Sequence, residues 1–285
     1  MRFTTVTSDF AHGTCPYCDN QAFKYRDSDT WMFLCHSCQR NLIFEKAEEH
    51  ARRNSSRSSS SRSSVSVAIN YDSILSNCEV LNSLPDSHCA VSFLRSRGID
   101  GDIFRDLFYI QDARNIAEAG SAKTSRSHKL VIPLRDNDKK LFGVQLRALD
   151  KDDSPKYQTI LFRDQDKLYG LDRINTDNDV VFVEGPLDSL FLNNSLAMCG
   201  SSMDLTKYKT LGIIALDNEP RNAQIVSKMK KFIEDGFRVV IWPDHVKEKD
   251  INDMVLAGYD PEQIINQSVY SGLTGKIKLN SWKKT

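Results

Sequence analysis

The chain has 285 residues, of which 40% are hydrophobic, and it carries 38 lysine and arginine residues against 38 aspartate and glutamate residues. This length and apolar content allow two domains or one large domain with a sizeable core, and the zero net charge excludes a protein that is polycationic throughout. No apolar run approaches the length of a membrane span, and the first residues lack the apolar core of a signal peptide. We therefore expect a cytoplasmic protein.

Two C-x-x-C pairs mark the first block of the chain, residues 1–50. The pairs are separated by sixteen residues, and four thiolates at this spacing are typical of a tetrahedral zinc site. Because the intervening segments 22–26 and 31–34 have the pattern of strands, the sequence predicts a zinc ribbon that metal binding helps to fold. His12 or His36 is an alternative ligand in place of one cysteine. The predicted zinc ligands are Cys15, Cys18, Cys35 and Cys38.

Aromatic and basic residues alternate along the predicted strands of this ribbon. Aromatic rings stack on unpaired bases and cations meet phosphates, so this mixture favours single-stranded nucleic acid as a ligand. We expect Trp31 and Arg40 to contact it. The alternative is that the aromatic residues only pack the small core of the ribbon.

Residues 51–69 separate the ribbon from the rest of the chain. The run from Arg52 to Ser64 contains only arginine, asparagine and serine, with neither an apolar residue nor an acid. A segment without apolar side chains cannot bury a core, so we predict a flexible, positively charged tether.

Residues 70–175 have a mixed pattern. Residues 71–110 look helical, including a segment that ends at Gly98 as a plausible C-cap. The apolar segments 129–134 and 141–146 flank a turn and predict a pair of strands.

Basic residues are frequent in two runs. Between residues 121 and 147 they outnumber the acids, and we expect Arg126 and Lys129 to lie on a track for nucleic acid. The C-terminal run from Lys276 to Lys284 contains no acid. The alternative for both runs is ordinary solubilising charge, and the second run is also a candidate for docking a partner.

Three apolar segments in residues 176–285 end in acidic residues. Their alternation with helical segments, such as 187–193 and 221–235, predicts right-handed βαβ units and a parallel sheet. Because the C-terminal ends of parallel strands meet at one edge, these acids should gather there and bind a divalent cation, Mg²⁺ or Mn²⁺. The predicted metal ligands are Glu184, Asp217, Glu219 and Asp250.

Other residues beside these acids have more than one interpretation. Gly185 permits a tight turn and the close approach of a phosphate. Asp188 either caps the following helix or orients a metal-bound water, and Asp253 either binds metal or caps or solvates a helix.

These residues together carry a resemblance to a known family. Glu184-Gly185, Asp217-x-Glu219 and Asp250 resemble the Toprim fold. The runs at 87–99, 143–147, 154–157 and 167–171 resemble the segments before the Toprim domain in bacterial-type DNA primases. The motifs at 184–191 and 216–221 are very similar to those of the replicative primases of T-even-type tailed phages.

The resemblance implies an α/β fold in which an N-terminal zinc ribbon is tethered to a primase catalytic core with a Toprim domain. The implied domains are the ribbon (1–50), the linker (51–69), the basic N-terminal part of the RNA polymerase core (70–175) and the Toprim domain with the C-terminal tail (176–285). The implied activity is DNA-dependent synthesis of short RNA primers from ribonucleoside triphosphates by metal-dependent nucleotidyl transfer.

The resemblance also implies roles for individual residues and partners. Glu184, Asp217 and Glu219 would be catalytic, with Glu184 a candidate general base, and Arg147 and Lys156 would face primer, template or triphosphate. The implied partners are single-stranded DNA template, a replicative hexameric helicase and a single-strand-binding protein. The chain ends soon after the Toprim segment, so we expect the helicase contact to use a surface other than a separate helicase-binding domain.

The sequence departs from the bacterial pattern at three positions. Glu219 stands in place of an aspartate, Asn252 in place of an acid and Asp164 in place of a lysine. One alternative function is a non-catalytic recombination mediator that combines a zinc module with a Toprim domain. Another is a Toprim nuclease, although no Gly-rich Gly-Lys-Ser/Thr loop accompanies the acids.

Overall fold

A computed structural model of the protein describes residues 71–200 and 205–284, together with five strands between residues 3 and 43. The chain divides into two compact units, Met1–Ala68 and Ile69–Thr285. Each unit has its own sheet structure.

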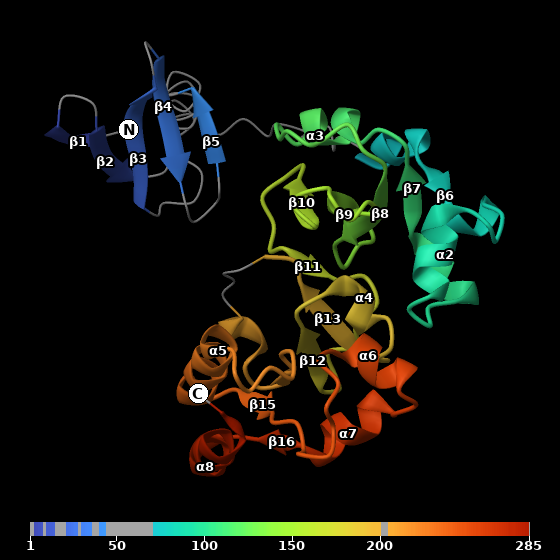
Figure 1. The fold of residues 1–285 in the computed structure, drawn as a ribbon. Helices are drawn as coiled ribbons and strands as arrows, with labels where there is room; N and C mark the ends of the chain where they lie inside the picture. The colour runs from blue at the N-terminus through green and yellow to red at the C-terminus, as the bar shows by residue number, and fades with distance from the viewer. Residues whose placement is uncertain are drawn as a thin grey trace. The chain divides into compact units, whose positions relative to one another are not determined.

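The N-terminal unit contains an antiparallel sheet of five strands in sequence order (Figure 1). Its strands are β1 (Phe3–Thr7), β2 (Phe10–Thr14), β3 (Gln21–Asp27), β4 (Thr30–Cys35) and β5 (Arg40–Ile43). The strands predicted at 22–26 and 31–34 lie in β3 and β4, which pair with Arg26 opposite Trp31. Phe33 on β4 is fully buried and supplies apolar core.

The second unit begins with a five-stranded antiparallel sheet. In spatial order its strands are β10 (Tyr157–Leu161), β9 (Leu141–Ala148), β8 (Lys129–Arg135), β7 (Phe108–Ile110) and β6 (Glu79–Val80). The predicted strand pair is confirmed as the hairpin of β8 and β9. Residues alternate between the faces of β8: Leu130 and Ile132 join the main core, whereas Val131 joins a smaller core on the other side.

The segment 71–110 is less helical than its sequence predicts. It contains the 3₁₀ helices η2 (Tyr71–Asn77), η3 (Leu81–Ser83) and η4 (Gly101–Asp106), the helix α2 (Cys89–Arg95), and the strands β6 and β7. The helix α3 (Arg114–Ala119) follows β7. Gly98 has a φ of +72°, and the Ile99 amide donates to the Leu94 carbonyl at 3.0 Å, so the expected glycine cap beyond α2 is confirmed.

The remainder of the second unit is built on a six-stranded sheet. In spatial order its strands are β11 (Leu168–Tyr169), β13 (Ser195–Met198), β12 (Val180–Val183), β14 (Gly212–Ile214), β15 (Arg238–Val240) and β16 (Val269–Tyr270). The four central strands are parallel and the two edge strands are antiparallel. The three apolar segments that lead to acids lie in β12, β14 and β15 and are parallel, as predicted, whereas β13 was not predicted. Because β13 and β14 flank β12 on opposite sides, the strand order reverses at β12 and leaves a crevice at the C-terminal ends of β12 and β14.

Helices accompany this sheet in the order α4 (Pro186–Ser189), η5 (Thr206–Tyr208), α5 (Ala223–Glu234), α6 (Ile251–Leu256), α7 (Pro261–Gln267) and α8 (Gly272–Trp282). The helix predicted at 221–235 is α5, whose N-cap Asn222 accepts from the Gln224 amide at 3.0 Å. The helix predicted at 187–193 is shorter, since α4 ends at Ser189.

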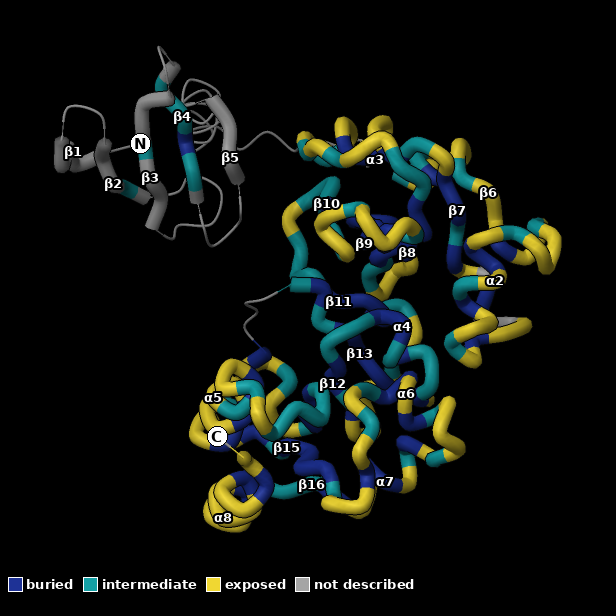
Figure 2. Tube along the Cα trace, viewed as in Figure 1, coloured by how far each residue is buried: buried dark blue, intermediate teal, exposed yellow. Residues whose placement is uncertain are grey.

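The main hydrophobic core lies between the elements of the second unit, where the strands are dark blue and the outer turns of α5 and α8 are yellow (Figure 2). Ile225, Met229 and Ile233 form the buried face of α5, and Gly275 lets α8 approach Ile233 closely. Within the described parts of the chain, none of the helices is long and apolar enough to cross a membrane.

Candidate active site

Acidic side chains from three loops meet at the crevice between β12 and β14. Glu184 directly follows β12, Asp217 lies beyond β14, and Asp250 follows the loop after β15 and caps α6. All three line one small cavity together with Asp188 of α4. The structure therefore brings together three of the four predicted metal ligands and adds Asp188 to them.

Burial and neighbouring acids raise the pKa of three carboxyl groups here, those of Glu184, Asp188 and Asp217. Burial, followed by the charges of Glu184, Asp188 and Asp250, raises the pKa of Asp217 to about 7. Burial and then Asp250 raise the pKa of Asp188 to about 6, and burial is also the main cause of a raised pKa at Glu184. Four carboxyl groups thus share a half-buried position where their negative charge is poorly compensated.

The donor set suits a hard divalent cation. Carboxylate oxygens are the preferred ligands of Mg²⁺, and the buried Oε1 of Glu184 has no hydrogen-bond partner among the described residues. Lys228 is 3.8 Å from that oxygen, too far for a hydrogen bond. Among the described residues, no three His, Cys, Asp or Glu side chains already surround one metal position. Binding an ion would therefore require these carboxyl groups to turn toward it.

Gly185 lies close to the side chain of Asp188 at this edge. A Cβ at this position would lie 2.8 Å from Oδ2 of Asp188, well inside van der Waals contact. The turn after β12 thus brings the backbone against the Asp188 carboxyl group, as the predicted Glu-Gly turn requires.

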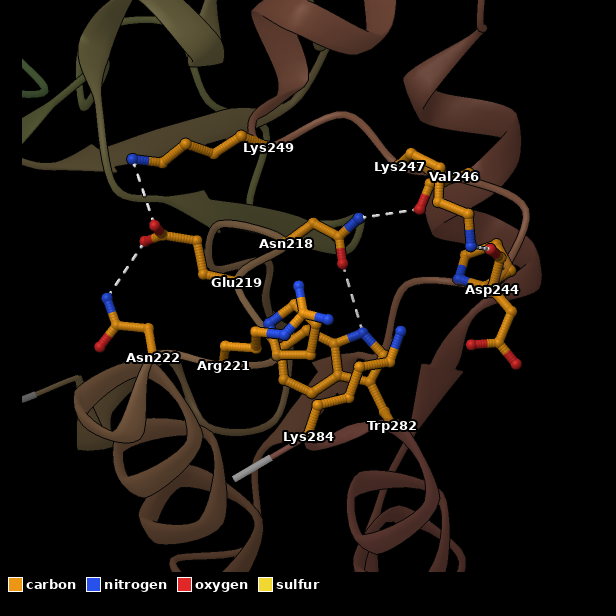
Figure 3. A pocket seen from close by; sticks show the side chains of 12 residues that line it. Asn218, Glu219, Arg221, Asn222, Asp244, Val246, Lys247, Lys249, Trp282 and Lys284 are labelled. Carbon is orange, nitrogen blue, oxygen red and sulfur yellow. Dashed lines mark hydrogen bonds and ion pairs between the residues drawn. The ribbon is translucent and has the colours of Figure 1, made fainter.

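Glu219 is turned away from the acidic cavity. Its Oε1 lies 3.4 Å from Nζ of Lys249, and its Oε2 accepts from Nδ2 of Asn222 at 3.2 Å (Figure 3). Glu219 does not line the cavity that holds Asp217. Lys249 nevertheless interacts with both acids: it pairs with Glu219, and its positive charge opposes the rise in the pKa of Asp217.

Asp250 and Asp253 have different structural roles. The side chain of Asp250 accepts from the Asp253 amide at 2.8 Å and so caps α6. Asp253 is exposed in the first turn of that helix, where an acid interacts favourably with the helix dipole. The helix cap considered for Asp253 is therefore supplied by Asp250.

Basic side chains from the antiparallel sheet reach the same region. Arg147 is only 6% exposed, and its guanidinium lies 4.7 Å from the Tyr157 ring and 5.3 Å from the Phe93 ring. Lys156 is exposed, and its pKa is lowered first by Arg147 and then by burial, with smaller effects from Arg97 and Lys249. Asp250 acts on the same lysine, so the predicted pair Arg147 and Lys156 lies near the acids.

The expectation for Lys129 requires correction. Its side chain is 4% exposed, forms an ion pair with Asp153 and donates to the Ser125 and Ser127 hydroxyls at 2.8 Å. Its charge is thus neutralised inside the protein and is not presented to a nucleic acid strand. Arg126 remains 80% exposed, with Asp112 at 3.8 Å.

Arg97 and Asn252 form a contact that the sequence did not predict. Nη1 of Arg97 donates to the side-chain Oδ1 of Asn252 at 2.8 Å. The backbone N–H of Asn252 donates to Oδ1 of Asp188 at 3.1 Å. Asn252, which replaces the acid of the bacterial pattern, is 2% exposed and ties the α2 segment to the acidic edge. In the sequence, only the place of Arg97 beside Gly98, within the run at 87–99, could have indicated a role for this residue.

The predicted zinc site falls mainly outside the described residues. This applies to Cys15, Cys18 and Cys38, while Cys35 ends β4 but its side chain is not described. The side chain of Arg40 on β5 is likewise outside the described set. Trp31 is partly exposed, and Nζ of Lys24 lies 4.5 Å from its ring centroid.

The fold of the chain is similar to that of solved DnaG-type primase structures. The DnaG primase catalytic domain bound to ssDNA matches with a TM-score of 0.55 and 18% identity, over 69% of this chain and 77% of that one. The Aquifex aeolicus primase structure with zinc-binding and RNA polymerase domains matches with a TM-score of 0.52 and 17% identity, over 94% of this chain and 81% of that one.

In sequence, the chain is similar to the DNA primase of Enterobacteria phage T4, with 34% identity over 222 residues. The match includes 74% of this chain and 65% of that primase. A DNA primase of Legionella pneumophila is 26% identical over 133 residues, or 36% of this chain and 23% of its own length. No family model matches the chain. The expected resemblance is confirmed: the chain is similar in sequence to a T-even phage primase and in fold to bacterial-type DNA primases.

Proposed function

We propose that this protein is a DNA-dependent primase, which joins ribonucleoside triphosphates into short RNA primers on a single-stranded DNA template. The observation that carries the proposal is the cavity lined by Glu184, Asp188, Asp217 and Asp250, at the sheet crevice of a primase-type core. The match to the T4 primase spans 65% of the length of that protein.

The carboxylates supply the metal site of this proposal. Glu184, Asp217, Glu219 and Asp250 would hold Mg²⁺ or Mn²⁺, which as a Lewis acid lowers the barrier to attack of a 3′-hydroxyl on an α-phosphate. Glu219 would first have to leave Lys249, with which it is paired at 3.4 Å. The raised pKa of Glu184 favours a role for this carboxyl group in accepting the proton of the hydroxyl.

The basic residues position the substrates. Arg147 is held between two aromatic rings, so its guanidinium has a fixed orientation for phosphate, and Lys156, directly before β10, adds a second, exposed charge. Arg126 is 80% exposed and only loosely paired with Asp112 at 3.8 Å, so it would exchange this partner for the template backbone. These charges attract the polyanionic substrates toward an edge that would otherwise repel them.

The N-terminal unit would select the start site on the template. Its sheet order and its match to the zinc-binding domain structure support a ribbon, and Cys15, Cys18, Cys35 and Cys38 have the spacing that holds structural zinc. Trp31 is partly exposed and suited to stack on an unpaired base, with Arg40 as a phosphate contact on β5.

The domains in this proposal are the ribbon (1–50), the tether (51–69), the basic part of the polymerase core (70–175) and the Toprim domain with its tail (176–285). Further partners would be a hexameric replicative helicase and a single-strand-binding protein. The place of action would be the cytoplasm of a host cell.

Sized reaction products separate this proposal from its alternatives. The full chain is incubated with single-stranded DNA, ribonucleotides and Mg²⁺, and the proposal expects short RNA products that depend on the template sequence. Binding without any product would favour the recombination mediator, and shortened template would favour the nuclease. Either result would contradict the primase.

A further inference from the structure

A larger cavity lies directly beside the acidic one. Its volume is about 510 Å³, within the range of sites that hold a nucleotide-sized ligand. The two cavities share no lining residue, but consecutive residues line them at three places: Asp217 and Asn218, Trp242 and Pro243, and Lys249 and Asp250. The same loops, after β14 and after β15, therefore supply walls to both cavities.

A network of hydrogen bonds around Asn218 fixes the walls of this cavity. Its Nδ2 donates to the carbonyls of Val246 and Glu248 at 3.0 Å, and its Oδ1 accepts from Nε1 of Trp282 at 3.3 Å. The C-terminal segment is held as well, because the Lys284 amide donates to the Pro220 carbonyl at 2.8 Å. The loops after β14 and β15 and the end of α8 thus form one built site (Figure 3).

Positive charge predominates on these walls. Four basic residues line the cavity against two acids, namely Arg221, Lys247, Lys249 and Lys284 against Glu219 and Asp244. Lys249 pairs with Glu219, and Lys247 donates to the backbone carbonyl of Asp244.

Two of these cations are available to a ligand. Within the described part of the chain, the side chains of Arg221 and Lys284 make no hydrogen bond or ion pair, and both lie at the cavity beside Trp282 (Figure 3). Both residues are exposed, so their charge is hydrated and ready to exchange water for an anion.

We propose that this cavity binds a linear phosphate chain: the triphosphate tail of the incoming ribonucleotide or the pyrophosphate released from it. The inference deepens the proposed function, on which it rests. An α-phosphate at the carboxylate edge would have its β- and γ-phosphates directed past Lys249 toward Arg221 and Lys284. The guanidinium of Arg221 presents paired donors that match phosphate oxygens, and Lys284 adds a point charge.

The test is direct binding by the full-length protein, without template and with the metal chelated. Inorganic triphosphate and pyrophosphate are titrated calorimetrically into the wild type, into Arg221→Gln with Lys284→Gln, and into Lys276→Gln as the control. Lys276 is exposed on the same helix α8 but does not line the cavity. The double variant should lose about tenfold or more in affinity, since it lacks two charged phosphate contacts, and the control should bind like the wild type.

The affinity for triphosphate is measured without any primer synthesis, so it tests the cavity separately from the proposed activity. Unchanged triphosphate affinity in the double variant would overturn the inference, and so would a loss of affinity for single-stranded oligonucleotide alone, which would assign the cavity to the nucleic acid backbone. A chain that binds triphosphate through Arg221 and Lys284 yet makes no primer would support the cavity and contradict the proposed function. Comparing triphosphate with pyrophosphate affinity distinguishes the incoming tail from the leaving group.

The same double variant also has a predicted effect on the kinetics of primer synthesis. The double variant should raise the KM for ribonucleotides about tenfold while kcat changes by less than about twofold, because the reacting atoms lie at the neighbouring carboxylates. A fall in kcat at unchanged KM would contradict a role in holding the phosphate chain. Thermal unfolding of each variant shows whether the fold is retained, which the exposure of both side chains leads us to expect.

Discussion

Replacing Asp217 with asparagine should stabilise the protein without metal while removing its response to metal. The pKa of Asp217 is about 7 in the folded protein against 3.8 ordinarily. Since one pKa unit equals about 1.4 kcal/mol, the charged carboxylate lowers the free energy of unfolding by at most about 4 kcal/mol at high pH. About half of that, roughly 2 kcal/mol, should be recovered by asparagine, because the neighbouring acids can also move apart.

The sign of the pH dependence follows from the raised pKa. Between about pH 4 and pH 7 the folded protein holds a proton on Asp217 that the unfolded chain has lost, so the stability of the metal-free wild type falls as pH rises through this window. Asparagine cannot ionise, and the advantage of the variant should therefore grow from pH 4 to pH 8.

Differential scanning calorimetry with and without Mg²⁺ measures both effects. At pH 8 in chelator, the variant should melt roughly 4–8 °C above the wild type, and Mg²⁺ should raise the melting temperature of the wild type alone. Asp177→Asn is the matched control, because this exposed acid lies outside the acidic cavity. Equal melting temperatures in chelator, or equal responses to Mg²⁺, would refute the account of this site.

Three further changes test other parts of the structure. Asn252→Ala removes both side-chain hydrogen bonds to Arg97, while the backbone amide that donates to Asp188 remains, and should cost about 1–3 kcal/mol in urea unfolding; a change within about 0.5 kcal/mol, as expected for the exposed Asn178→Ala, would speak against the contact. Lys129→Ala removes the cation from the buried Asp153, which keeps the Ser125 and Ser127 hydroxyls as partners, and should cost about 3–5 kcal/mol in the same assay at unchanged template affinity; a stable variant with weak template binding would instead support a nucleic acid contact by Lys129. Cys35→Ser should abolish stoichiometric zinc and template-dependent initiation while the 69–285 unit melts as before; zinc content equal to the wild type would exclude this ligand.

The sequence predicted the acidic edge well because its signal is local. Apolar strands that end in acids specify both the sheet and the edge at which those acids gather, and Glu184, Asp217 and Asp250 indeed line one cavity. The two-residue edge strands β11 and β16 were missed, since their pairing depends on neighbours that are distant in sequence. The segment 71–110 was predicted as too helical because short 3₁₀ turns share the apolar spacing of an α-helix.

Side-chain partners were harder to predict than elements. Arg97 and Asn252 are 155 residues apart, and only the folded chain brings them together. Lys129 belongs to a basic run, but its burial with Asp153 removes its charge from the surface. Glu219 follows the expected motif and yet faces Lys249, a pairing that depends on how the loops after β14 and β15 meet.

Incorporation of labelled ribonucleotides on single-stranded DNA tests the central claim most directly. With Mg²⁺, the wild type should produce short RNA of defined length, and Asp217→Asn should reduce its yield by at least about a hundredfold while binding the template with similar affinity. RNA synthesis by the variant at the wild-type rate, or no RNA from the wild type on any template, would contradict the account.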